Sequence, residues 1–146
     1  MLWAETSPNT VYMTQPLADG KTLEVTWGEA ANQVTRVANY LKSLNLPAGS
    51  SIGLLGRNSA HWILADLSVW MAGHVTVPLY PTLNAESAEY ILEHSECKLL
   101  FLGKLDGKAD GWNEIGVVMG ALAAVLLLTM VALIAATPLL RLLGEK

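Results

Sequence analysis

Residues 116–140 restrict what this chain can fold into more than any other part of it, because twenty-five consecutive positions carry no charged side chain. Twelve of these residues are Leu, Ile or Val, and Glu114 and Arg141 stand on either side. A helix of this length spans about 37 Å, against a bilayer hydrocarbon core of ~30 Å. The run therefore predicts one transmembrane helix over residues 116–140. The alternative is a helix or hairpin buried inside a larger protein.

The preceding part of the chain is acidic. Residues 1–115 contain seven Lys or Arg and twelve Asp or Glu. This balance argues against nucleic-acid binding, which requires clustered basic side chains to displace counterions. Cys97 is the only cysteine, so no disulfide can form within the chain.

The N-terminal residues bear on localisation. Residues 1–25 contain no basic segment followed by an apolar stretch, and Pro8, Pro16 and Gly20 interrupt them, so no cleaved signal peptide is predicted. Basic residues near the span are too evenly balanced to set its orientation. We therefore expect a single-span membrane protein with residues 1–115 facing the cytosol. Membrane lipid is the expected partner of residues 116–140.

A hairpin and a long helix are predicted near the N-terminus. Asp19-Gly20 is typical of a tight turn, and residues 22–26 fit the second arm of a hairpin. Thr26-Trp27-Gly28-Glu29 matches a capping box, the signature of a helix start. Apolar residues then recur at helical spacing, which predicts an amphipathic helix from Trp27 to about Leu44. Its expected inner face consists of Ala30, Val34, Val37, Ala38 and Leu41.

Three short apolar runs, at residues 51–55, 75–77 and 98–102, alternate with helical patterns at 59–72 and 85–95. The predicted fold class is α/β: a partial doubly wound parallel sheet of three βα-type units, covered on both faces, followed by one transmembrane α-helix. Asn58 is the predicted N-cap of the 59–72 helix, and Gly73 is its predicted stop. Pro78 and Pro81 are expected to end the second strand. The next helix is expected to have Asn84 or Thr82 as its N-cap.

The predicted division of the chain is a folded unit at 1–102, a Gly-rich charged linker at 103–115, the span at 116–140 and a short tail at 141–146. The helix at 59–72 is apolar almost all round, which is typical of a helix buried on every side. This indicates that the segment belongs inside a larger body. The alternative is a central helix packed between the sheet and the N-terminal segment.

No catalytic, cofactor-binding or metal-binding residue is predicted. His94 and Cys97 are three residues apart, but a metal site needs three or four ligands. Gly103–Ala109 is the nearest approach to a phosphate loop, and it has three residues between its glycines where such a loop has four. Ala109 also stands where a Ser or Thr would hold Mg²⁺.

Several blocks in order resemble the N-terminal segment of AMP-forming (adenylate-forming) long-chain fatty acid–CoA ligases over residues 3–114. The most specific is Ala72-Gly73-His74-Val75-Thr76-Val77-Pro78-Leu79-Tyr80-Pro81-Thr82. The others lie at residues 3–16, 26–29, 49–62 and 90–96. The resemblance implies that residues 1–102 are an incomplete AMP-binding domain.

The same resemblance implies a reaction and its requirements. These ligases activate a fatty acid with ATP and Mg²⁺ to an acyl-adenylate, then transfer the acyl group to coenzyme A. Their phosphate loop, Mg²⁺ site, ribose-binding carboxylate and lid lysine lie downstream of the segment that resembles this chain. ATP, Mg²⁺ and coenzyme A therefore belong to the family, and no residue of this chain is assigned to them.

Two functional hypotheses follow. The first is a truncated fatty acid–CoA ligase, inactive by itself, in which the resemblance ends near Glu114 and the hydrophobic tail is unrelated. That tail is expected to come from a truncated or chimeric reading frame, the alternative being a genuine tail-anchored product. The second hypothesis is a small tail-anchored membrane protein with a non-catalytic α/β partner-binding module. The oligomeric state is not predicted.

Overall fold

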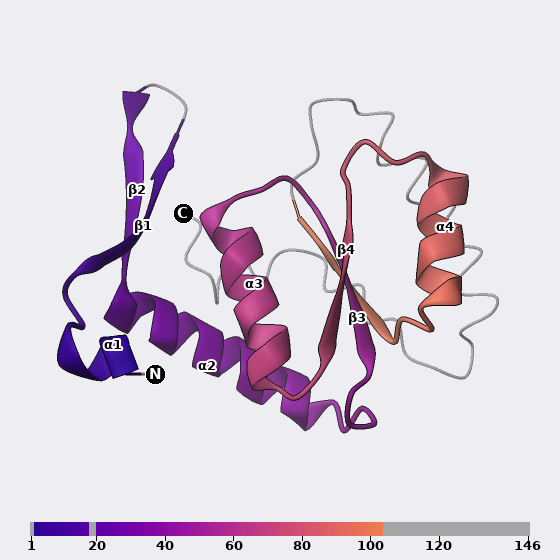
Figure 1. Cartoon of the computed structure of the whole chain (residues 1–146), viewed down its shortest axis with the longest axis horizontal. Coiled ribbons are helices and arrows are strands. Elements are labelled where there is room, and N and C mark those ends of the chain that lie inside the picture. The colour runs from indigo at the N-terminus through magenta and orange to yellow at the C-terminus, as the bar shows by residue number, and fades with distance from the viewer. Residues whose placement is uncertain (1, 18–19, 104–146) are drawn as a thin grey trace.

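The computed structural model describes residues 2–17 and 20–103 (Figure 1). A short helix, α1 (Leu2–Thr6), precedes a hairpin of β1 (Val11–Pro16) and β2 (Thr22–Thr26). The order is then α2 (Trp27–Ser43), β3 (Ser51–Leu55), α3 (Ala60–Met71), β4 (Val75–Leu79), α4 (Ala85–His94) and β5 (Leu99–Leu102). The predicted span and tail, and the predicted linker apart from Gly103, lie outside the described residues. Among the helices described, none has the length and apolar character needed to cross a membrane.

The capping box at the start of α2 is confirmed. The Glu29 amide donates to the Thr26 hydroxyl over 3.2 Å, and the Thr26 amide donates to the Glu29 carboxylate over 2.8 Å. These bonds satisfy amides that have no partner within the helix. The buried positions of α2 are those that helical spacing predicted: Ala30, Val34, Val37, Ala38 and Leu41.

Strand β3 is the centre of a parallel sheet in the order β4-β3-β5. Its register places Ser51 beside Val75 on one side and Ile52 beside Leu99 on the other. The hairpin is a separate two-stranded antiparallel sheet. The predicted parallel α/β arrangement is therefore confirmed.

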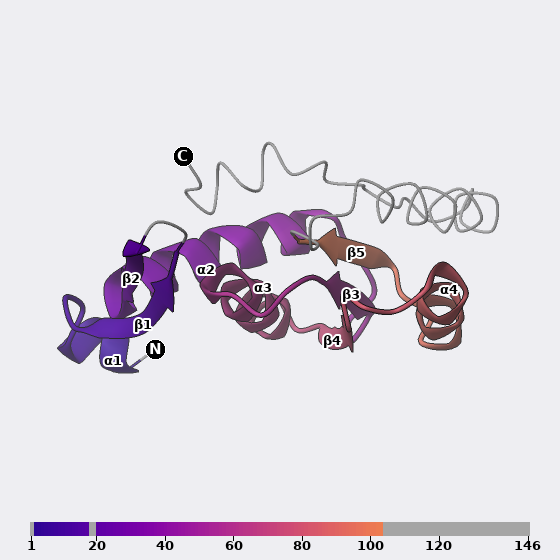
Figure 2. The same cartoon turned by 90° about the horizontal axis from the view of Figure 1, so that it is seen from above.

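Helices cover both faces of the parallel sheet, as Figures 1 and 2 show: α2 and α3 lie on one side of it and α4 on the other. Side chains of β3 alternate between the two resulting cores. Ile52 and Leu54 join the core under α2 and α3, whereas Leu55 joins the core under α4. Burial of each large aliphatic side chain stabilises the fold by roughly 1.5–3 kcal/mol.

Two predicted boundaries were wrong by a small margin. The N-cap of α3 is Ser59 rather than Asn58, because the extended Ser59 backbone directs its hydroxyl to accept from the Trp62 amide over 3.1 Å. Strand β4 does not end before Pro78 but continues to Leu79. A proline is tolerated there because β4 is an edge strand in the described sheet, and its missing N–H faces away from β3.

Helix α1 was not predicted. It is only five residues long, and its stability comes from a tertiary contact, since the Trp3 ring stacks on Trp27 at a centroid distance of 6.3 Å. Tyr12 of β1 stacks on the same indole at 3.9 Å. The N-terminal segment is thereby held against the start of α2.

Helix α3 lies between α2, the parallel sheet and β1. Leu64 and Val69 are fully buried on its inner side. On the outer side Trp70 is 63% exposed and Ile63 is 37% exposed. The described part of the chain thus fits the alternative of a central helix, but it leaves one apolar face of α3 uncovered.

Candidate functional site

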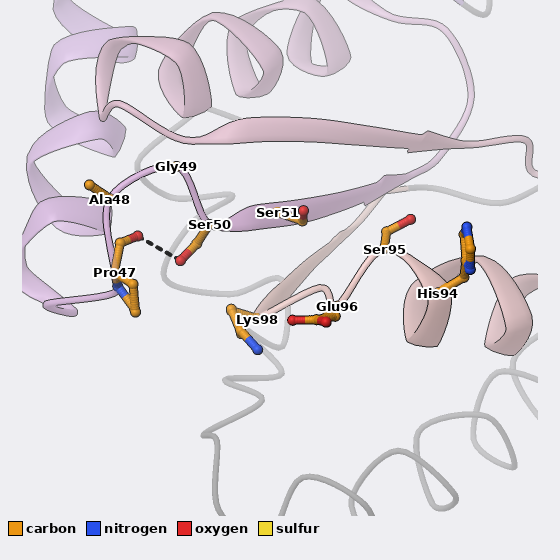
Figure 3. Close-up of a pocket in the computed structure, with 9 residues that line it drawn as sticks. All are labelled: Pro47, Ala48, Gly49, Ser50, Ser51, His94, Ser95, Glu96 and Lys98. Carbon is orange, nitrogen blue, oxygen red and sulfur yellow. Dashed lines mark hydrogen bonds between the residues drawn. The ribbon is translucent and has the colours of Figure 1, made fainter.

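A hollow of about 350 Å³ opens at the start of β3 and β5 (Figure 3). It is bordered by Pro47, Ala48, Gly49, Ser50, Ser51, His94, Ser95, Glu96 and Lys98. The Ser50 hydroxyl is already engaged, because it donates to the Pro47 carbonyl over 2.6 Å. Open α/β sheets bind ligands outside the carboxyl ends of their strands, and this hollow is at the amino ends. We therefore assign it no catalytic role.

The carboxyl edge of the sheet is the alternative site, and two glycines shape it. Gly56 follows β3 and Gly103 follows β5. A Cβ added to Gly56 would lie 3.1 Å from the Gly103 Cα, and the Gly103 amide donates to the Leu55 carbonyl over 2.7 Å. The two strand ends therefore meet backbone against backbone. No sequence motif predicts this contact. The one local signal for it is that a glycine directly follows each of the two apolar strands.

Exposed polar groups stand at the same carboxyl edge. Arg57 and Asn58 follow β3, and Tyr80, which is 77% exposed, follows β4. Next to them, Ser59 is occupied in capping α3. A guanidinium, an amide and a phenol can bind anionic or hydroxyl groups, but they supply neither a nucleophile with its base nor a carboxylate for Mg²⁺. The described edge can thus border a binding site without performing chemistry.

Residues that could hold a metal are not brought together. Among residues 2–17 and 20–103 there is no group of three or more His, Cys, Asp or Glu side chains that could bind an ion. His94 is exposed and its ring stacks on Tyr90 at 5.6 Å. Burial raises the pKa of the Cys97 thiol to about 11, and the smaller opposing effect of the Lys98 charge does not cancel this rise. Cys97 is a core residue rather than a thiolate.

Two buried polar atoms, one directly before β4 and one within it, were not anticipated from the sequence. His74 Nδ1 and Thr76 Oγ1 are buried and have no hydrogen-bond partner within the described structure. Thr76 is level with Ile52, a residue of the core under α2 and α3. Such atoms suit a buried water molecule. A sequence pattern cannot show them, since it does not show which neighbours supply partners.

An open parallel sheet with helices on both faces, preceded by a hairpin, is a fold that many enzymes share. The family model for AMP-binding enzymes matches residues 2–138. The chain therefore belongs to the AMP-binding enzyme family. The match continues through most of the predicted span, and the comparisons do not test whether residues 116–140 have another origin.

Individual relatives narrow the comparison to acyl-CoA ligases. The chain is 36% identical over 112 residues to the long-chain-fatty-acid–CoA ligase FadD15 of Mycobacterium bovis, a match that covers 77% of this chain and 18% of the relative. It is 33% identical over 104 residues to the long chain acyl-CoA synthetase 3 of Arabidopsis thaliana. That match covers 68% of this chain and 16% of the relative. The chain thus spans less than a fifth of the length of these relatives.

Solved structures show the same fold. The fatty acid AMP ligase from Legionella pneumophila superimposes with a TM-score of 0.64 at 24% identity, covering 69% of this chain and 18% of that one. The acyl-CoA synthetase from Brucella canis gives a TM-score of 0.59 at 24% identity, covering 65% and 18%. At this identity the likeness establishes the fold alone.

Proposed function

We propose that this chain supplies the first part of a ligase that activates a long-chain fatty acid with ATP and transfers it to coenzyme A. The observation that carries the proposal is the 36% identity to the Mycobacterium bovis ligase over 112 residues. That length takes in most of the described fold. The fatty acid is the proposed substrate, because FadD15 and the resemblance of residues 3–114 both concern long-chain fatty acid ligases.

In the proposed reaction a fatty-acid carboxylate oxygen attacks the α-phosphorus of ATP, and pyrophosphate leaves as the acyl-adenylate forms. The coenzyme A thiol, losing its proton, then attacks the acyl carbonyl and AMP leaves. The described residues do not fit a Mg²⁺ site, since no cluster of carboxylates is present among them. No step is therefore assigned to a side chain of this segment. Its proposed role is to form the sheet and helices on which the reacting groups are mounted.

We further propose that the 146-residue chain does not adenylate fatty acids by itself. The support is its sequence, which contains no Ser/Thr/Gly-rich phosphate loop, and in which Gly103–Ala109 has the wrong spacing. Purified protein with ATP, Mg²⁺ and a long-chain fatty acid should release no pyrophosphate above background. Steady release that follows the protein through purification contradicts this.

A chimera tests the proposed function directly. Residues 3–114 of this chain replace the matched segment of the Mycobacterium bovis ligase, and pyrophosphate release is measured with a long-chain fatty acid. We expect turnover that depends on both ATP and the fatty acid, because the substituted segment should rebuild the same scaffold. A matched chimera carrying Gly56→Ala, which forces apart the contact with Gly103, should lose part of that activity. A folded but inactive parent chimera would reject the proposal.

Membrane attachment through residues 116–140, with residues 1–115 cytosolic, is a separate proposal. Its support is the length of the uncharged run. The family match extends to residue 138, which favours an alternative in which this uncharged run is part of a ligase domain. The hypothesis of a non-catalytic tail-anchored module gains no support, because the relatives named above are ligases and synthetases.

A further inference from the structure

The loop that joins β3 to α3 consists of residues 56–59 and follows the carboxyl end of β3. Its two middle residues, Arg57 and Asn58, are exposed. Open α/β sheets bind ligands outside the carboxyl ends of their strands. The position of the 56–59 loop therefore determines where two polar side chains stand beside a ligand bound at this edge.

Contacts hold the 56–59 loop at both of its ends. At the first end Gly56 lies against backbone, since a Cβ added to it would be 3.1 Å from the Gly103 Cα. At the second end the Ala60 amide donates to the Gln15 Oε1 over 2.6 Å. Ala60 is the first residue of α3, so its amide has no partner within that helix. The second end of the loop thus depends on a side chain from the hairpin.

The hairpin directs Gln15 towards α3. Met13 and Gln15 share one face of β1, because residues two apart on a strand point to the same side. Met13 packs against the core under α2 and α3, so this face is the inner one. The hairpin is itself fixed to α2: Tyr12 stacks on Trp27 at a centroid distance of 3.9 Å, and the Trp27 amide donates to the Thr10 carbonyl over 3.0 Å. Gln15 therefore reaches the start of α3 from an anchored strand.

We propose that Gln15 is a positioning residue of the ligase: by accepting from the Ala60 amide it fixes the 56–59 loop, and so holds Arg57 and Asn58 beside the ligand. The inference rests on the proposed function, because it takes the carboxyl edge of the sheet as part of that function's binding site. The ligand group is anionic, a phosphate or a carboxylate, since a guanidinium and an amide N–H both donate to such groups. Gln15 acts through the loop and takes no part in the chemistry.

Hydrogen exchange by mass spectrometry on the full 146-residue chain tests whether the bond fixes the loop. Gln15→Met keeps the length of the side chain and removes its acceptor, whereas Gln15→Glu retains an acceptor oxygen. Exchange at the Ala60 amide, followed in the peptide over residues 56–62, should be roughly fivefold faster in Gln15→Met because one hydrogen bond is lost. It should be unchanged in Gln15→Glu. Equal exchange in Gln15→Met and the original chain would overturn the inference.

Thr26→Ala is the matched control, because it removes the hydroxyl that caps α2 and leaves the 56–59 loop intact. Loss of either cap should lower the urea midpoint by a similar amount. Exchange over residues 56–62 should nevertheless keep its original rate in Thr26→Ala. Faster exchange there in both variants would indicate a general loss of stability and overturn the inference. If circular dichroism shows that Gln15→Met does not fold, Gln15→Ala takes its place, since it too has no acceptor.

Kinetics of the chimera described above test the effect on ligand binding. KM and kcat are measured with ATP, the fatty acid and coenzyme A varied in turn, because each carries an anionic group. For at least one of them Gln15→Met should raise KM roughly fivefold and change kcat less than about twofold, the pattern of lost binding rather than lost chemistry. Gln15→Glu should restore the original KM, and Thr26→Ala should leave it unaltered. Unchanged KM for all three substrates would show that the bond serves stability alone and would overturn the inference.

The two measurements separate this inference from the proposed function. An inactive parent chimera rejects the proposed function, and the exchange rates of the 146-residue chain then decide whether Gln15 fixes the loop. An active parent chimera whose Gln15→Met variant keeps every KM supports the proposed function and rejects the inference.

Discussion

The Gln15 side-chain Oε1 accepts a hydrogen bond of 2.6 Å from the backbone amide of Ala60, forty-five residues further along the chain. Ala60 is the first residue of α3, where backbone amides have no partner within the helix. The bond therefore ties the hairpin to the start of the central helix. It is partly buried, so water cannot fully replace it.

Replacing Gln15 by Ala should lower the free energy of unfolding by about 1 kcal/mol, because the Ala60 amide loses its acceptor. Urea unfolding followed by tryptophan fluorescence measures this. Thr14→Ala, at the exposed neighbouring position of β1, is the control and should have little effect. Equal stability of the two variants would show that the Gln15–Ala60 bond contributes nothing.

The cap of α2 should make stability depend on pH. Hydrogen bonds from the Thr26 backbone amide and hydroxyl hold the pKa of Glu29 below its ordinary value of 4.5. A carboxylate with a lowered folded pKa contributes stability above its unfolded pKa, and this contribution is lost as the pH falls through the folded value. The free energy of unfolding should therefore decrease less steeply between pH 7 and pH 3 for Glu29→Gln than for the original chain. Parallel pH profiles would contradict the assignment.

The thiol of Cys97 should be slow to alkylate in the folded chain. Burial raises its pKa to about 11 from an ordinary value of 9.0, so little thiolate forms at pH 8. Iodoacetamide labelling followed by mass spectrometry should be much faster once urea has unfolded the protein. The same shift predicts stability that is fully present below pH 9 and declines as the pH rises towards 11. Cys97→Ala should remove that decline, and rapid labelling of the folded chain would refute the buried thiol.

Gly56→Ala should destabilise the fold more than Gly53→Ala, although the added Cβ would have the shorter contact at Gly53. A Cβ at Gly53 would lie 2.8 Å from the methyl ends of Leu92 and Leu100, which can rotate away. A Cβ at Gly56 would meet the backbone of Gly103 at 3.1 Å, and backbone atoms yield less easily. Gly56→Ala should therefore destabilise the fold by about 1–3 kcal/mol and exceed the effect of Gly53→Ala. Thermal unfolding of both variants decides the order.

The proposed membrane span makes a prediction about fractionation. Expressed in bacteria, the full chain should remain in the membrane pellet after alkaline carbonate extraction, with a reporter at residue 1 accessible from the cytosol. Replacing two central residues, Leu127 and Leu128, by Lys should release it, since each charge at mid-span costs about 2.5–3.5 kcal/mol. Full release of the unmodified chain would reject the span, and a protected N-terminus would reverse the proposed orientation.

Local patterns in the sequence predicted most of the elements in the described fold. The capping box, the five buried positions of α2 and the three apolar strands were all correct, because spacing along a single helix or strand determines which side chains share a face. The errors at Asn58 and Pro78 are displacements of an element's end by one or two residues, where several adjacent residues could cap or terminate equally well.

The candidate site was less accessible to prediction. The sequence led us to assign no catalytic, cofactor or metal residue, and the comparisons do not test that assignment. Arg57, Asn58 and Tyr80 reach one edge only because β3 and β4 are parallel neighbours, and Gly56 meets Gly103 only because β5 lies on the other side of β3. The spacing of residues within one helix or strand predicts neither arrangement.

The sequence by itself determined the family, the alternation of helices and strands and the residues that each element buries, since these depend on periodicity and on short ordered motifs. Only the tertiary structure decided the strand order β4-β3-β5 of the described sheet and the bond between Gln15 and Ala60. The reason is that these contacts join residues tens of positions apart. Their free energy depends on how whole elements pack, which no window along the chain contains.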